Sequence, residues 1–255
     1  MVIKLKSDDE IATMREAGRI VANTLAGLRD MIVPGLNVLE IEKYVREEFK
    51  RVGAKETFLN YAPGNKAPYP SNICVSINEQ LVHGIPKNRV LQEGDLVTLD
   101  LGATYNGYVG DSAITVAVGK VNPIAEKLIE VTEAALWAGI KAARPGCHLN
   151  DVRGAIEDTI KKSGFSIVKG YGGHGVGRDM HEEPHVENFR QRFKGPKLQP
   201  GLVLALEPMV NAGGPDVFEG PDGWTVSTKD GSLCCHFEHT IAIRAGGEAE
   251  VLTLP

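Results

Sequence analysis

Two ten-residue stretches of this 255-residue sequence, residues 91–100 and 198–207, align with each other without a gap. Each contains a strand-like apolar run, and each ends in an acid, Asp100 in the first and Glu207 in the second. This pattern is a strong constraint, because burying a lone carboxylate costs several kcal/mol unless it is paired or bound to a metal. The match therefore predicts two similar structural units, each with an acid in its interior.

Further matches follow in the same order along the chain. Residues 34–53 match residues 145–164 in a Pro-Gly pair, an acid and a final Gly, with the same difference in residue number each time. This constant difference aligns two predicted pairs of helices. The remaining matches are Val82-His83-Gly84-Ile85 with Gly173-His174-Gly175-Val176, and Asp111-Ser112-Ala113-Ile114 with Glu238-His239-Thr240-Ile241. The matched polar residues lie inside otherwise apolar strands, and this favours a real duplication over a chance similarity. We expect one domain over residues 1–255, with pseudo-twofold-related halves of about 8–120 and 121–255.

Helix and strand signals support an α+β fold with helices and strands in the same order in each half. Ser7-Asp8-Asp9-Glu10 is a capping box that begins a long helix, and Gly53 ends a second helix that starts near residue 38. The other predicted helices cover residues 123–143 and 149–163. The predicted strands cover residues 73–77, 97–101, 108–118, 202–206, 224–227 and 235–243. Asn106-Gly107 is a typical two-residue hairpin turn.

Composition excludes several classes of protein. The net charge is −5 and there is no run of Lys and Arg, so neither nucleic acid nor an anionic membrane is expected as a primary ligand. No apolar run approaches the roughly 18 residues of a spanning helix, and the polar start lacks a signal-peptide core. Four cysteines without a C-x-x-C pair suggest reduced thiols. We therefore expect a cytoplasmic protein.

The hairpin turn places two acids close together. If Asn106-Gly107 is the turn, residue 102 faces Asp111, and Asp100 and Asp111 become diagonal neighbours about 7–8 Å apart on one face. Two buried carboxylates this close need a counter-ion. The alternative is that both acids face solvent beside turns, but Asp100 is not next to one.

The predicted symmetry would bring the acids of both halves to the axis. Asp100, Asp111, Glu207 and Glu238 would then meet His83 and His174. Four carboxylates and one or two imidazoles suit a pair of divalent ions such as Mn²⁺, Fe²⁺, Co²⁺ or Zn²⁺. Two such ions about 3.5–4 Å apart would activate a bridging water, so hydrolysis is the expected reaction class.

These residues, taken together, resemble a known family. The motifs are Val82-His83-Gly84-Ile85-Pro86, Asp100, Gly110-Asp111, Gly173-His174-Gly175-Val176-Gly177, His181-Glu182-Glu183-Pro184, Glu207-Pro208-Met209 and Phe237-Glu238-His239-Thr240. In this order they resemble the type I methionine aminopeptidases of the pita-bread metallopeptidase superfamily. The resemblance covers nearly the whole chain and is to the minimal bacterial or organellar form.

The resemblance implies a fold and a set of site residues. The fold would be two α+β halves around a curved antiparallel sheet, and Asp100, Asp111, His174, Glu207 and Glu238 would bind two metal ions. His83 would face the substrate and assist proton movement. His181 would hydrogen-bond the scissile amide and the tetrahedral intermediate. Glu207 would also be the general base.

The same resemblance implies a methionine-binding slot lined by Tyr69, Cys74, Met180 and Trp224, which together are apolar and polarisable. Relatives often carry an aromatic residue at the position of Met180, so the slot's shape is expected to differ here. The sequence assigns no role to His185.

The implied activity is removal of the initiator methionine from nascent polypeptides with a small second residue, by a monomeric enzyme. Whether it meets these chains at the ribosome is left open. A Xaa-Pro aminopeptidase or dipeptidase with the same ligands is one alternative, although such enzymes usually carry an additional N-terminal domain. A metal-free binding protein on the same fold is another. A glycosidase using two of the carboxylates would leave the histidines unexplained.

Overall fold

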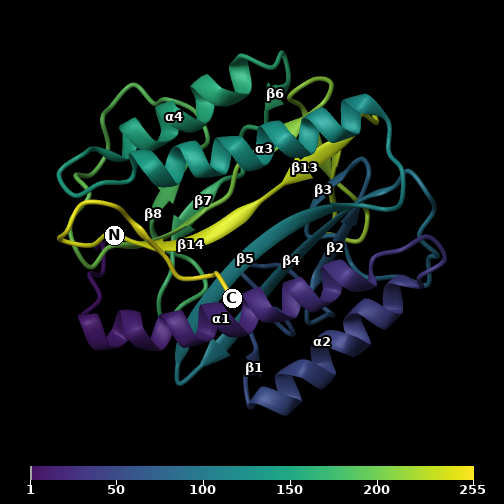
Figure 1. Ribbon diagram of the computed structural model, residues 1–255, viewed down its shortest axis with the longest axis horizontal. Helices are drawn as coiled ribbons and strands as arrows, with labels where there is room; N and C mark the ends of the chain where they lie inside the picture. Colours follow the sequence, from purple (N-terminus) through teal and green to yellow (C-terminus); the bar gives the residue numbers. More distant parts are fainter. Residues whose placement is uncertain (1) are drawn as a thin grey trace.

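The computed structural model describes residues 2–255 and contains four helices and three antiparallel sheets in that range (Figure 1). The helix pairs flank the central strands: α1 and α2 lie along one side in Figure 1, and α3 and α4 along the other. Within residues 2–255, every helix is too short or too polar to cross a membrane.

The four helices start and stop close to where the sequence predicts. They are α1 (Asp8–Met31), α2 (Val38–Val52), α3 (Pro123–Ala142) and α4 (Leu149–Lys161). Ser7 and Glu10 form the reciprocal capping box at the start of α1. Gly53 ends α2 in the left-handed conformation, at φ 71°.

The strands are numbered in chain order and many are short. They are β1 (Lys55–Glu56), β2 (Cys74–Ile77), β3 (Gln80–Val82), β4 (Leu96–Tyr105), β5 (Tyr108–Ala117), β6 (Ser166–Ile167), β7 (Gly173–Gly175), β8 (Glu182–Val186), β9 (Val203–Leu206), β10 (Met209–Asn211), β11 (Val217–Glu219), β12 (Val226–Thr228), β13 (Cys234–His236), β14 (Glu238–Ala242) and β15 (Glu250–Val251).

A nine-stranded sheet connects the two halves of the chain. Its strand order is β1-β4-β5-β14-β9-β7-β8, with β2 also paired to β4 and β15 to β14. The path passes from the first half to the second where β5 pairs with β14. Two three-stranded sheets, β13-β10-β6 and β11-β12-β3, complete the β-structure.

The predicted hairpin between β4 and β5 is confirmed. Asn106 and Gly107 both have positive φ, at 48° and 79°, as a two-residue turn of this type requires. Gly102 pairs with Asp111 across the hairpin, so the predicted register is correct. Since Asp100 pairs with Ala113, Asp100 and Asp111 are diagonal neighbours.

One strand prediction is wrong. Residues 235–243 do not form a single strand, because the chain leaves the β10 sheet after His236 and joins the central sheet at Glu238. Phe237 lies at the break and is buried. The apolar pattern continues through the break, so periodicity alone could not locate it.

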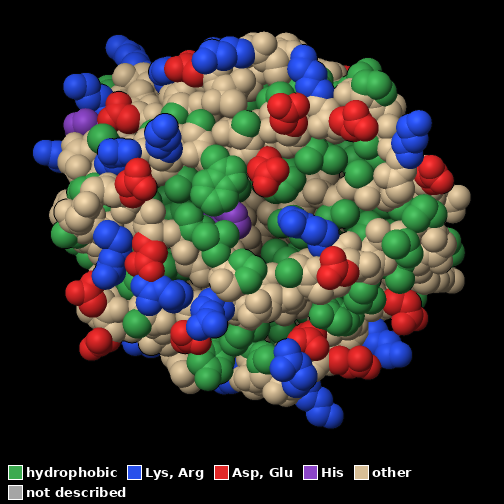
Figure 2. Space-filling model, viewed as in Figure 1, with side chains coloured by type: hydrophobic (Ala, Val, Ile, Leu, Met, Phe, Trp, Pro, Cys, Tyr) green, Lys and Arg blue, Asp and Glu red, His purple; other side chains and the backbone are tan. Residues whose placement is uncertain are grey.

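Strands β5 and β14 present different residues on their two faces, as alternating side chains require. Ser112 and His239 line a hollow of about 230 Å³ between α1 and α3, where Trp137 is also found. Figure 2 shows the face of the molecule that contains this hollow. The preceding residues, Asp111 and Glu238, lie on the opposite face and line a second, larger pocket.

Helix α1 lies directly against β5. A Cβ atom added to Gly110 would lie 2.5 Å from the backbone nitrogen of Gly18, which no real Cβ atom tolerates. Glycine at position 110 therefore allows the helix to approach the strand that carries Asp111.

Candidate metal centre

Five neighbouring strands of the central sheet each provide one predicted ligand. In sheet order β4-β5-β14-β9-β7, these are Asp100, Asp111, Glu238, Glu207 and His174, with Glu207 directly after the last residue of β9. The register aligns them, because Glu238 and Asp100 both pair with Ala113, while His239 pairs with Leu206 and His174 with Ala205. Residues more than a hundred positions apart thus meet on one face of the sheet.

The side-chain atoms of the predicted ligands lie close to one another. Nε2 of His174 is 3.6 Å from Oδ2 of Asp111 and 3.6 Å from Oε1 of Glu207. One ligand atom each from Asp111, His174 and Glu238 all lie within 4.8 Å of one another. Oδ1 of Asp111 and Oε1 of Glu238 are buried and lack a hydrogen-bond partner among the described residues.

The buried negative charges of this cluster would be stabilised by a cation. Burial and mutual repulsion raise the pKa values of Asp111 and Glu238 well above their ordinary values. Burial also raises the pKa of Asp100, which keeps partial access to the pocket, to about 7. A divalent ion would neutralise these acids and provide partners for their unpaired oxygens. The donor set of carboxylates and one imidazole therefore fits a divalent metal.

Glu207 differs from the other three acids. Burial acts to raise its pKa, but contact with His236 and the nearby His174 outweigh burial, and the pKa of Glu207 lies below its ordinary value. Glu207 is thus the acid of the cluster best suited to be ionised without a metal.

The five predicted ligands line a pocket of about 340 Å³. Its lining includes every predicted site residue, and it also includes Phe58, Tyr61, Pro63 and Lys66, which the sequence analysis did not identify. The last four follow α2 in an irregular loop, where no periodic pattern marks side chains that face a site.

The predicted methionine slot is the apolar wall of this pocket. Tyr69, Cys74 and Trp224 are buried in one cluster with Phe58, and Met180 packs against it. The Tyr69 and Trp224 rings meet edge to face, with centroids 5.1 Å apart. The Tyr69 hydroxyl donates to the Gly84 carbonyl at 2.8 Å, which fixes the ring.

The two remaining predicted histidines line the same pocket but have different neighbours. His83 has a positive φ of 59° and its ring contacts Trp224 edge to face. Burial lowers the pKa of His83 to about 4, so the ring is neutral at pH 7. The His181 ring lies tilted against the His174 ring, with centroids 4.2 Å apart, and Nδ1 of His181 is 2.6 Å from the Tyr61 hydroxyl.

His185 does not line the pocket. Its side chain is exposed, and its backbone carbonyl accepts a hydrogen bond from Arg153 at 2.9 Å. The buried His236 lies beside Glu207 and was also missed by the sequence analysis. Its position two residues before Glu238 is a signal that strand alternation could have provided.

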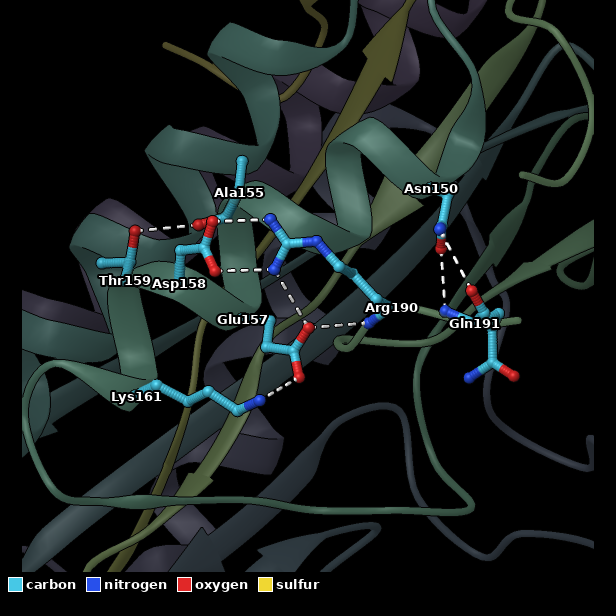
Figure 3. Close-up of polar contacts among 8 residues, drawn as sticks. All are labelled: Asn150, Ala155, Glu157, Asp158, Thr159, Lys161, Arg190 and Gln191. Carbon is cyan, nitrogen blue, oxygen red and sulfur yellow. Dashed lines mark hydrogen bonds and ion pairs between the residues drawn. The ribbon is translucent and has the colours of Figure 1, made fainter. Parts of the chain in front are cut away.

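The segment that follows β8 is fixed to helix α4 (Figure 3). Arg190 makes two 2.6 Å bonds to the carboxylate of Asp158, and its backbone N–H donates to Glu157. Gln191 and Asn150 exchange hydrogen bonds at 2.8 and 3.1 Å. From the same segment, Asn188 donates to the backbone carbonyl of Glu207 at 3.0 Å. The α4 network therefore supports the backbone of Glu207, a predicted ligand, from outside the pocket.

Comparison with known proteins agrees with this geometry. The model of metallopeptidase family M24 matches residues 12–245. The chain is 47% identical to a methionine aminopeptidase of Aquifex aeolicus, over 97% of each chain. The crystal structure of a methionine aminopeptidase from Thermotoga maritima superimposes with a TM-score of 0.95 at 42% identity, covering 100% of both chains.

A more distant likeness concerns the fold alone. A Xaa-Pro dipeptidase structure from Bacillus anthracis matches with a TM-score of 0.76 at 24% identity, over 98% of this chain but 61% of that protein. The predicted α+β pita-bread fold is thereby confirmed. With its full-length relatives and its matched family model, the chain belongs to metallopeptidase family M24, in the group of the methionine aminopeptidases.

Proposed function

We propose that this chain removes N-terminal methionine from polypeptides whose second residue is small. One observation carries the proposal: five strands each direct one ligand to a pocket whose wall is apolar and contains sulfur. Family membership supports a metal-dependent peptidase.

The metal ligands in this proposal are Asp100, Asp111, His174, Glu207 and Glu238, which would hold two divalent ions, with Co²⁺, Mn²⁺, Fe²⁺ and Zn²⁺ as candidates. Divalent ions in such a site act as Lewis acids and lower the pKa of water. The unpaired, buried oxygens of Asp111 and Glu238 support this assignment.

Glu207 is the proposed general base. A base must be unprotonated before it reacts, and Glu207 alone among the four clustered acids has a pKa below its ordinary value. Its carboxylate can therefore accept a proton from the attacking water.

His181 is the proposed donor to the carbonyl oxygen of the scissile bond. Burial raises the pKa of the Tyr61 hydroxyl, so this hydroxyl keeps its proton and can donate it to Nδ1 of His181. The other ring nitrogen, Nε2, then carries the proton and is free to donate to the negative charge that develops on oxygen. His83, neutral at pH 7, would face the substrate and assist proton movement.

The methionine side chain would occupy the slot formed by Tyr69, Cys74, Met180 and Trp224. Rings meeting edge to face and a buried thiol provide the polarisable contacts that a thioether favours. Nascent polypeptides as the physiological substrates, and a cytoplasmic monomer as the working form, remain part of this proposal.

Two peptides test the proposal against its alternatives. Chain reconstituted with Co²⁺ or Mn²⁺ should release methionine from Met-Ala-Ser and leave Ala-Pro-Ser intact, as measured by mass spectrometry. Release of alanine from Ala-Pro-Ser would favour a Xaa-Pro aminopeptidase. No turnover with any divalent ion would favour a binding protein.

A substitution tests the dual role of Glu207. Glu207→Ala should abolish turnover and weaken metal retention, measured by elemental analysis after dialysis. Glu219→Ala, which removes the acid that pairs with the pocket residue Lys66, is the matched control and should retain metal. An active Glu207→Ala variant with a full metal content would contradict the assignment.

A further inference from the structure

His236 is a buried imidazole that the proposed mechanism does not use. Its side chain is 1% exposed, and neither ring nitrogen has a hydrogen-bond partner within residues 2–255. A buried polar group without a partner is costly and requires an explanation. The nearest acid is Glu207, whose Oε2 lies 3.4 Å from Nε2 of His236.

The backbone fixes His236 beside Glu207. His236 pairs with Met209 across strands β13 and β10, and the same register continues beyond the break at Phe237, where His239 pairs with Leu206. His236 and Glu238 therefore face the same side, and this register places Glu207 opposite Glu238 and diagonal to His236. Thr115 holds the backbone of His236 through bonds of 2.8 and 3.2 Å.

The two oxygens of Glu207 face two different imidazoles. Oε1 lies 3.6 Å from Nε2 of His174, a proposed metal ligand, whereas Oε2 lies 3.4 Å from Nε2 of His236. We propose that His236 is a positioning residue, whose Nε2–H donates to Oε2 of Glu207 and leaves Oε1, the oxygen on the side of His174, free to act as a metal ligand. This inference rests on the proposed role of Glu207 as a ligand.

A further observation supports this role. In the alignment of Asp111 with Glu238, the position equivalent to His236 is Val109, a buried apolar residue. The fold thus accepts an apolar side chain at this place in a strand, and the imidazole serves the acid beside it.

Two substitutions of nearly equal shape isolate the donor. His236→Gln keeps an N–H group at about the same distance, whereas His236→Met has similar length but no donor. Calorimetric titration of metal-free protein with Co²⁺ should show wild-type affinity for His236→Gln within about threefold. For His236→Met we expect a loss of about 10- to 100-fold, the usual cost of removing the partner of a metal ligand. Cys235→Ala, one residue away and buried, is the matched control.

Nuclear magnetic resonance of metal-free wild-type protein with labelled histidines provides a readout that needs neither metal nor a folded variant. The tautomer of His236 should carry its proton on Nε2. A ring protonated only at Nδ1, or equal Co²⁺ affinity for the Gln and Met variants, would overturn the inference. A wild-type chain that binds no Co²⁺ would instead refute the proposed function, while the tautomer still tests the His236–Glu207 contact.

Discussion

Removal of the metal should make the stability of this protein fall as pH rises. The pKa values of Asp100, Asp111 and Glu238 lie above their ordinary values when the protein is folded and metal-free. At pH values between the ordinary and the raised pKa, the folded state holds a proton that the unfolded state has lost. Raising the pH in this range therefore favours unfolding. Metal binding displaces these protons, and the stabilisation by metal should therefore increase with pH.

The size of the effect follows from the number of protons displaced. Each displaced proton changes the metal-dependent stabilisation by about 1.4 kcal/mol per pH unit. One proton held throughout the range from pH 6.5 to 8.5 gives about 3 kcal/mol, or roughly 5–10 °C in melting temperature for a chain of this size.

The histidines do not obscure this trend. Burial lowers the pKa values of His83 and His239 to about 4, so their contribution to stability rises between pH 4 and 6.5 and is complete above that range. Above pH 6.5 the raised pKa values of the clustered carboxyls determine the slope.

Thermal melts in EDTA and in excess Mn²⁺, recorded from pH 6.5 to 8.5, measure the effect. Calorimetry in two buffers with different ionisation enthalpies counts the released protons directly. Asp230→Asn is a suitable control, because the backbone N–H of Gly214 lowers the pKa of this exposed carboxyl to about 2. An increment in melting temperature that is the same at both ends of the range, without proton release, would refute the reasoning.

Three further predictions concern the scaffold and the slot. Gly110→Ala should destabilise the protein by about 1–3 kcal/mol in urea unfolding, because the new Cβ meets the backbone of Gly18; an unchanged midpoint would contradict the close approach. Trp224→Ala should raise KM for methionyl peptides by about tenfold or more, since about 1.5–3 kcal/mol of burial is lost, and equal KM values would exclude Trp224 from the slot. Arg190→Ala should make residues 186–197 sensitive to limited proteolysis, whereas resistance equal to wild type would show that the contacts in Figure 3 are dispensable.

The sequence predicts the central part of this structure well because its signals are local or repeated. The capping box at Ser7 and the Asn106-Gly107 turn each depend on a few adjacent residues, and both are confirmed. The hairpin then fixes the relation of Asp100 to Asp111 without further information. The pairing of the two halves came from the repeat, and the duplication itself stays a prediction.

Other parts of the site could not be predicted because their position depends on tertiary packing. Tyr61 and Lys66 reach the pocket from an irregular loop, which carries no periodicity. The short strand β7 is rich in glycine and has little intrinsic strand preference, so its pairing with β9 is a result of the surrounding sheet.

Because side chains alternate along β5 and β14, the far side of the sheet is directly connected to the strands that carry two proposed metal ligands. Ser112 and His239, which line the hollow in Figure 2, are each joined to a proposed ligand by a single peptide bond. A substitution on that side of the sheet therefore acts on the same backbone that sets the positions of Asp111 and Glu238.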